Sequence, residues 1–281
     1  MPAKRVHRLL YYHLQAVERP RKEIPLLRRT AVTPALPIAV LSVLAVLSVL
    51  SFPAFAQPPS AQDVADRALQ ALGGKEAWDN TRYIHFTFAG RRTHWWDKWT
   101  GRHRVEGQNQ EGQKYVVLEN INTKEGTAYL NGQKVEGDKA KEMLEAAYGA
   151  WVNDTYWLLM PYKLRDPGVN LSYAGEETID GKTYDKLALS FEKVGLTPGD
   201  RYWAYINRDT GLMDRWAYIL QDMPKEGPPT VWRWEGWQKH GNVMLAPGRT
   251  RVGDDRKLDL TNIAVSDQLP DSVFTSPEPV K

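Results

Sequence analysis

Short segments with a two-residue hydrophobic repeat dominate the chain from Tyr83 onward, and tight turns separate them. The segments are rich in aromatic and β-branched residues, whereas dipeptides such as Asn131-Gly132 and Pro247-Gly248 mark the turns. The pattern predicts strands over 83–88, 93–99, 114–119, 127–130, 170–176, 183–191, 201–206, 212–221, 230–239, 243–252 and 257–265. This favours a mainly β (α+β) fold built on a single large curved antiparallel sheet, which must close or be covered to bury one face.

Two segments have helical spacing instead. Residues 61–72 repeat apolar side chains at helical intervals, with Ser60 or Asp63 as the N-cap and Gly73-Gly74 as the end. Residues 138–151 gather apolar side chains on one side and Lys and Glu on the other. An apolar stretch follows and ends at Pro161. We expect the helix over 138–151 to cover the sheet.

The first hairpin allows its two faces to be predicted. With Gly90-Arg91 as the turn, Phe86 lies opposite Trp95, and Ile84 lies opposite Asp97. The inward face then carries Ile84, Phe86, Phe88, Trp95 and Trp99, while Trp96, His85 and His94 lie on the wetter face.

The N-terminal region reads as an export signal. Eight Lys or Arg residues precede an apolar run that begins near residue 35 and ends in Ala54-Phe55-Ala56. We therefore expect residues 1–56 to be cleaved after export to the periplasm, with retention in the inner membrane by residues 35–56 as the alternative. Residues 57–61 form a linker, 62–277 form the β domain and 278–281 form a tail.

Charge after residue 56 argues against nucleic acid as a partner. The whole chain has a formal net charge of +3, but residues 57–281 hold 29 basic and 32 acidic residues. We therefore find no basic footprint for nucleic acid. Cysteine is absent from the chain, so there is neither a disulfide nor a cysteine that could carry a lipid anchor.

The eleven Trp residues all lie beyond residue 77 and have two readings. They can fill an ordinary core, or some of them can line a cavity for an apolar ligand on the concave face of the sheet. For the second reading the candidate ligand-binding residues are Ile84, Phe86, Phe88, Trp95, Trp99, Leu118, Met143, Leu144, Ala147 and Trp151.

Residues that could carry catalysis or hold a metal are sparse. His85 and His94 share a face in the predicted hairpin, but no Glu or Cys at ligand spacing accompanies them, so we expect no metal site and no cofactor. Asp97 is predicted to face the apolar side and to pair with Arg102 or Arg104. Nucleophile-elbow, zinc-protease and phosphate-loop motifs are absent from the sequence. A hydrolase that uses Asp97 or a His remains the least favoured function.

Several short motifs, taken in order, resemble those of the LolA-like group of outer-membrane lipoprotein-sorting proteins. They are the helix that ends in Ala71-Leu72-Gly73-Gly74, the turn Asn207-Arg208-Asp209-Thr210-Gly211, and the closing Leu269-Pro270-Asp271 with Phe274. The resemblance implies an unclosed antiparallel barrel of about ten to eleven strands, with helices over the concave face and an apolar cavity for acyl chains. The functional arginine of the soluble carrier in that group has no assignable match in this sequence.

The function expected from these observations is a non-catalytic periplasmic carrier or sensor of a lipid or a lipoprotein acyl chain. Inner- and outer-membrane sorting proteins are further partners that the resemblance implies. The alternative is a structural or protein-interaction module of the envelope, with a packed core and exposed aromatic strands such as 230–239 as its docking surface.

Overall fold

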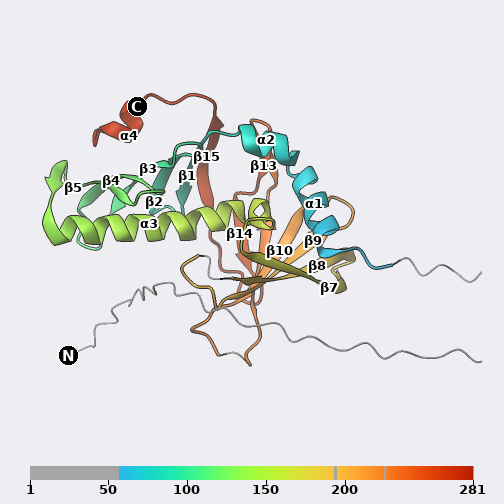
Figure 1. Ribbon diagram of the computed structural model, residues 1–281. Helices are drawn as coiled ribbons and strands as arrows, with labels where there is room; N and C mark the ends of the chain where they lie inside the picture. The colour runs from blue at the N-terminus through green and yellow to red at the C-terminus, as the bar shows by residue number, and fades with distance from the viewer. Residues whose placement is uncertain (1–56, 193–194, 225, 281) are drawn as a thin grey trace, which may run out of the picture. The chain divides into compact units, whose positions relative to one another are not determined.

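A computed structural model describes residues 57–192, 195–224 and 226–280 (Figure 1). The predicted export signal lies outside these residues. The helices are α1 (Ala61–Ala71), α2 (Gly74–Asn80), α3 (Gly137–Leu159), the 3₁₀ helix η1 (Met160–Lys163) and α4 (Ser272–Thr275). None of the described helices is both long enough and apolar enough to cross a membrane.

The strands form two main antiparallel sheets. The first has seven strands in the order β15-β1-β2-β3-β4-β5-β6, and the second has six in the order β14-β11-β10-β9-β8-β7. A two-stranded sheet joins β12 and β13. The bounds are β1 Tyr83–Phe88, β2 Arg92–Asp97, β3 Arg102–Gln108, β4 Lys114–Asn120, β5 Glu125–Leu130, β6 Gln133–Val135, β7 Val169–Ile179, β8 Lys182–Phe191, β9 Arg201–Asn207, β10 Met213–Ile219, β11 Thr230–Glu235, β12 Gln238–His240, β13 Val243–Leu245, β14 Gly248–Arg251 and β15 Leu260–Ser266.

One segment of chain links the two main sheets. Residues 256–260 bond to β14, with Leu258 N donating to Arg249 O at 3.0 Å and Leu260 N donating to Pro247 O at 2.9 Å. The same chain then continues as β15, which pairs with β1. The two sheets therefore follow one another as an open, curved array, and the prediction of a mainly β, unclosed antiparallel fold is confirmed. The array is not one unbroken hydrogen-bonded sheet. The segment up to Leu260 bonds to the β14 side, and β15, which follows, pairs with β1 instead.

The N-terminal helix begins as predicted. Ser60 is the N-cap of α1, and its hydroxyl accepts from Asp63 N while the Asp63 carboxylate accepts from Ser60 N. Gly73 ends the helix with φ of +116°, and the short helix α2, which the sequence pattern did not reveal, follows at once. An alanine Cβ at Gly73 would lie 2.3 Å from Asn242 O, so this glycine lets the β12–β13 turn approach the helices closely.

Helix α3 is longer than the predicted 138–151. It continues through the apolar stretch as far as Leu159, because the buried side chains Thr155, Leu158 and Leu159 keep helical spacing there. Pro161 follows in η1. Figure 1 shows α3 lying across the seven-stranded sheet from β5 towards β14.

The motif turn at 207–211 has a structural role. The Arg208 guanidinium donates to the buried Asp185 carboxylate at 2.7 and 2.9 Å, and Arg67 of α1 pairs with the same carboxylate. Asp185 lies on β8, so this ion-pair group fastens α1 to the six-stranded sheet.

The closing motif forms a strap on the outer face of the seven-stranded sheet. Phe274 of α4 stacks on Tyr83, and Val273 packs in the same cluster as Trp95. The buried Arg104 of β3 donates to three backbone oxygens of the strap, those of Val273, Ser276 and Glu278. The outer face of this sheet is therefore covered in part by the chain's own C-terminal segment.

Candidate ligand site beneath helix α3

Most of the predicted ligand-binding residues pack between helix α3 and the inner face of the seven-stranded sheet. Ile84, Phe86 and Phe88 of β1 are buried there and form one apolar cluster with Trp151 of α3. Met143, Leu144 and Ala147, one to two turns earlier on α3, pack with Val105, Val117 and Ala128 of the sheet in another. Seven of the ten predicted residues are thus brought together under α3.

The other three predicted residues lie elsewhere. Trp95 packs on the outer face against the C-terminal strap, and Leu118 shares that face because it lies opposite Arg104. Trp99 is 57% exposed and donates its indole N–H to Asp79 O. None of the three belongs to the two apolar clusters that α3 forms with the inner face of this sheet.

The predicted register of the first hairpin was wrong by one residue. Phe88 lies opposite Arg92, Phe86 opposite His94 and Ile84 opposite Trp96. The turn is made by Ala89 and Gly90, both with positive φ, and Arg91 N bonds back to Phe88 O. A three-residue connection replaces the predicted two-residue turn, so every β2 side chain changes face. Trp96 is therefore a buried inner residue, and His94 no longer shares a face with His85.

Asp97 lies opposite Tyr83 rather than Ile84. Its carboxylate pairs with Arg82 and Arg102, which confirms the expected pairing with Arg102. It also accepts from the backbone N–H of Trp99 and Thr100 in the following turn.

A buried chain of charged and polar side chains joins α3 to the inner face of the sheet. Asp154 of α3 accepts from Arg92 Nε and Nη2, each at 2.8 Å, and contacts His94 Nε2 at 2.8 Å. His94 Nδ1 lies 3.0 Å from His103 Nε2, and His103 Nδ1 lies 2.8 Å from Glu119 Oε1. The side chains of Asp154, His94, His103 and Glu119 are fully buried.

The number of protons in this buried group of side chains follows from its hydrogen bonds. The contacts Asp154–His94, His94–His103 and His103–Glu119 need three protons, but two neutral imidazoles supply only two. We infer that His103 and Glu119 share a third proton. With Arg92 charged and Asp154 ionised, the whole group is then neutral, as its burial requires.

The protonation of His94 and Asp154 fits this arrangement. Burial is the largest influence on His94 and lowers its pKa from 6.5 to about 4, so its ring is neutral at neutral pH. Burial alone would raise the pKa of Asp154, but the hydrogen bonds from His94 and Arg92 outweigh it and leave this pKa below its ordinary value. His94 therefore donates to Asp154 and accepts from His103.

The lowered pKa of His94 predicts loss of stability in acid. Between pH 6.5 and 4 the unfolded chain protonates His94 while the folded chain does not, so the free energy of unfolding falls by about 3 kcal/mol as the pH is lowered through this window. In His94→Gln this part of the pH dependence should vanish, because an amide can donate to Asp154 and accept from His103 without titrating. Urea denaturation across this pH range measures it; equal slopes for the variant and the parent would contradict the assignment.

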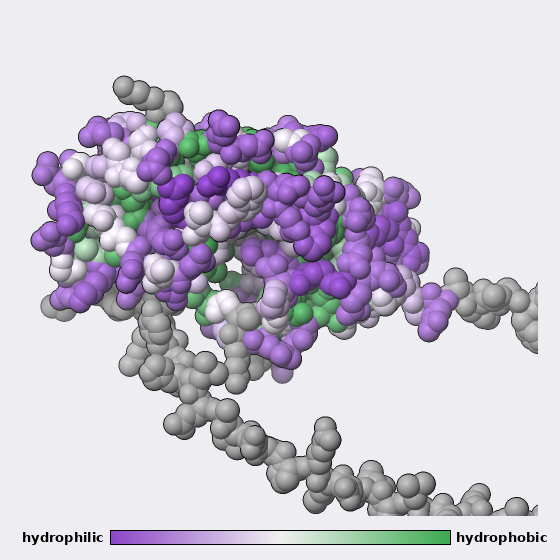
Figure 2. Space-filling model, turned by 45° about the horizontal axis from the view of Figure 1, so that its top comes forward, coloured by the Kyte–Doolittle hydropathy of each residue, from purple (hydrophilic) through white to green (hydrophobic). Residues whose placement is uncertain are grey.

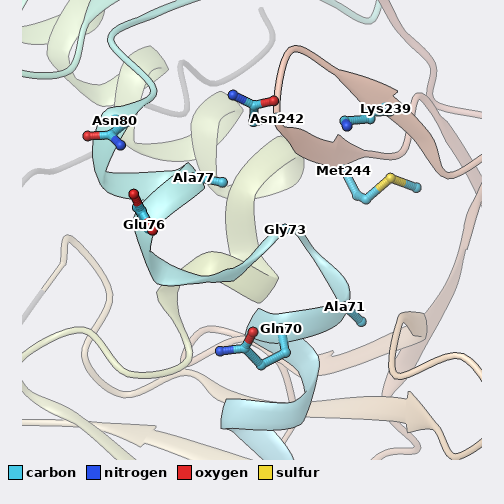
Figure 3. Close-up of a pocket in the computed structure, with 9 residues that line it drawn as sticks. All are labelled: Gln70, Ala71, Gly73, Glu76, Ala77, Asn80, Lys239, Asn242 and Met244. Atoms are coloured by element: carbon cyan, nitrogen blue, oxygen red, sulfur yellow. The ribbon is translucent and has the colours of Figure 1, made fainter.

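Two surface pockets lie away from α3. One, of about 520 Å³, is lined mostly by polar and small residues of α1, α2 and the β12–β13 hairpin, together with Met244, and Gly73 lies between the two helices (Figure 3). The other, of about 350 Å³, is lined by residues of β8, β10 and β11, among them Asp214 and Arg233. Figure 2 shows a mostly polar surface with apolar residues visible in the hollow near its middle. Across the described residues, no group of three His, Cys, Asp or Glu side chains could hold a metal ion.

The buried chain of histidines was the main feature that the sequence interpretation missed. Strand β3 (Arg102–Gln108) was not predicted, although Gly101 directly precedes it. Without β3 there was no partner for His94. An alternation of His103, Val105 and Gly107 on one face was the available signal.

Comparison with known proteins gives structural neighbours but no activity. A model of a family of unknown function (DUF6503) matches residues 116–227, from β4 to the loop after β10. No curated protein matches the chain. A DUF1329 family protein from Desulfovibrio piger is 14% identical, with 76% of this chain and 96% of that chain covered and a TM-score of 0.43.

Two further crystal structures belong to the group that the sequence resembles. A LolA superfamily protein from Nitrosomonas europaea is 12% identical, with 78% of this chain and 99% of that chain covered and a TM-score of 0.41. An outer membrane lipoprotein-sorting protein domain from Vibrio parahaemolyticus is 7% identical, with coverages of 75% and 97% and a TM-score of 0.38. LolA-like proteins are thus among the structural neighbours of this chain.

Proposed function

We propose that this protein is a periplasmic carrier or sensor that binds an acyl chain between α3 and the inner face of the seven-stranded sheet, without catalysis. The ligand would be a lipid or the acyl chain of a lipoprotein. Ile84, Phe86 and Phe88 would contact it from the sheet, and Met143, Leu144, Ala147 and Trp151 from the helix.

The observation that carries this proposal is the uneven burial of α3. Its C-terminal end is anchored, because Asp154, Thr155, Leu158 and Leu159 are all buried. Between Gly137 and Asn153, only Ala147 is buried. This longer N-terminal part of the helix covers an apolar sheet face through Met, Leu, Ala and aromatic side chains, which are contacts that an acyl chain could replace.

The energetics favour such an exchange. Each CH₂ group removed from water contributes about 0.8 kcal/mol, so one long acyl chain supplies ample affinity even after the helix contacts are lost. The motion required is the lifting of one helix about its anchored end, which is the kind of lid opening that occurs in microseconds to milliseconds.

The alternative function, a protein-interaction module of the envelope, required an exposed aromatic docking surface over residues 230–239. Trp232 and Trp234 of β11 are buried, and Trp234 packs in the core with Trp216. The strand therefore does not present these rings for docking, and the prediction of an exposed aromatic surface over 230–239 was wrong at both positions.

A disulfide across the lid tests the proposal. Ala128 of β5 and Ala147 of α3 are small, buried and packed in one cluster, and the native chain contains no cysteine. In Ala128→Cys/Ala147→Cys, oxidation should slow uptake of a fluorescent long-chain fatty acid at least tenfold, and reduction should restore it. Ala147→Cys alone is the control. Equal uptake by the oxidised and reduced double variant would contradict a lid at α3.

A further inference from the structure

Arg249 of β14 is buried without an ion-pair partner. Its side chain is fully buried, and its guanidinium donates to three backbone oxygens: Ala246 O at 2.9 Å, Gly248 O at 2.7 Å and Trp157 O at 2.6 Å. Among the described residues no carboxylate lies within ion-pair distance of it. Burial lowers its pKa, and Glu235 and Asp259 oppose this only from a distance. A buried charge that lacks a counterion is costly, so the position calls for an explanation.

Part of the explanation is the end of α3. The Trp157 carbonyl would normally accept from the N–H of the residue four positions later, but that residue is Pro161, which has none. Arg249 Nη2 supplies the missing donor, and a cation at a helix C-terminus is also favourable. A neutral donor could serve the carbonyl equally well, however, and this contact leaves Arg249 Nε unused.

Three unpartnered donors lie on neighbouring side chains of the inner face of the six-stranded sheet, a group that we call the stack, in which Arg249 lies over the Trp234 ring and Trp216 meets that ring edge-on. Arg249 Nε, Trp234 Nε1 and Trp216 Nε1 are all buried and have no hydrogen-bond partner among the described residues. The Arg249 guanidinium lies 3.5 Å from the ring centroid of Trp234, whose ring is 6.5 Å from that of Trp216. Buried N–H groups are nearly always paired. This set contains donors and a positive charge but no acceptor.

The surroundings of the stack suit a hydrocarbon chain. The Trp157 ring of α3 makes edge contacts with Trp216 and Trp232, at centroid distances of 4.9 and 5.2 Å. It packs both against the apolar cluster that contains Trp216 and Trp234 and against the cluster that contains Ile84, Phe86 and Phe88. From Trp157 back to Ala147 the helix rises about 15 Å. One acyl chain in a bilayer leaflet has the same reach, since it spans half of a core about 30 Å thick.

We propose that Arg249, Trp234 and Trp216 form a head-group site for an anionic amphiphile, with a carboxylate or phosphate at this stack and its chain directed along α3 towards Ala147. This rests on the proposed function, since the head group would enter through the same opening of α3. The oxygen atoms of the head would supply the acceptors and the negative charge that the stack lacks, as charge-assisted hydrogen bonds.

Binding of matched probes tests the assignment. Palmitic acid, lysophosphatidic acid and the neutral analogue palmityl alcohol are titrated into the full chain by calorimetry. We expect at least one anionic probe to bind tenfold or more tightly than the alcohol, and the stronger of the two anions identifies the head group as carboxylate or phosphate. Equal affinity for all three would overturn the head-group site and leave the acyl-chain proposal standing. Binding of none would overturn both.

Variants locate the site. Arg249→Gln should remove the preference for anions, and Trp216→Phe/Trp234→Phe, which keeps the rings but removes both N–H donors, should reduce it at least threefold even if Arg249→Gln does not fold. Trp232→Phe is the matched control, because its indole N–H already donates to Tyr218 Oη at 3.2 Å. A preference lost equally in Trp232→Phe would contradict the assignment to these three residues.

Discussion

Asp154→Ala should lower the free energy of unfolding by about 3–5 kcal/mol, the usual cost of removing one partner from a buried ion pair. Arg92 would lose both of its carboxylate contacts, and the fully buried His94 would lose the acceptor for Nε2. The Arg92 guanidinium would then keep a positive charge that no group on α3 balances. Chemical denaturation with urea measures the effect.

Two neighbouring variants show whether charge is the cause. Asn153→Ala alters the adjacent, exposed side chain and removes one hydrogen bond to Asp154, so we expect a cost of only about 1 kcal/mol. Asp154→Asn keeps the size and an acceptor but loses the charge, and its cost should fall between the two. If Asp154→Ala were no more costly than Asn153→Ala, the buried network would not hold α3 to the sheet.

Ala147→Trp should reduce the amount of co-purified acyl ligand at least tenfold. Ala147 of α3 packs in one cluster with Val105, Val117 and Ala128 of the sheet. A tryptophan at this position would occupy the place proposed for the acyl chain. Overpacking of this kind also costs about 1–3 kcal/mol of stability, so the melting temperature is measured alongside ligand content.

Ala146→Trp is the matched control on the same helix. Ala146 is exposed, so the same substitution there adds an aromatic ring to the solvent face without entering the interface. Its ligand content should equal that of the parent protein. Equal ligand content in the two variants would place the chain somewhere other than under α3.

The sequence pattern predicts the elements of this fold better than their contacts. Two-residue periodicity and turn dipeptides locate most strands, and Ser60 with Asp63 marks the start of α1. The start of α3 also follows from its amphipathic pattern, whereas its end does not, because an apolar run before a proline fits a strand as well as a buried helix.

Single-residue effects explain what the pattern could not predict. Ala89 adopts a left-handed conformation that is unusual for alanine, and this one residue moves Trp95 and Trp96 to opposite faces from those expected. The group formed by Asp154, His94, His103 and Glu119 comes from three strands and a helix, so no local spacing reveals it. The contact between Arg249 and Trp157 likewise joins residues 92 positions apart.

The mass of whatever the protein carries tests the central claim most directly. The chain is purified from its own host without detergent and analysed by native mass spectrometry, with lipid extraction of the same sample. The account predicts a bound species whose mass matches an acyl-bearing lipid or acylated peptide, present in the parent and in Ala146→Trp and depleted in Ala147→Trp. Protein that carries no such species, and that takes up no long-chain fatty acid when one is supplied, would contradict the account.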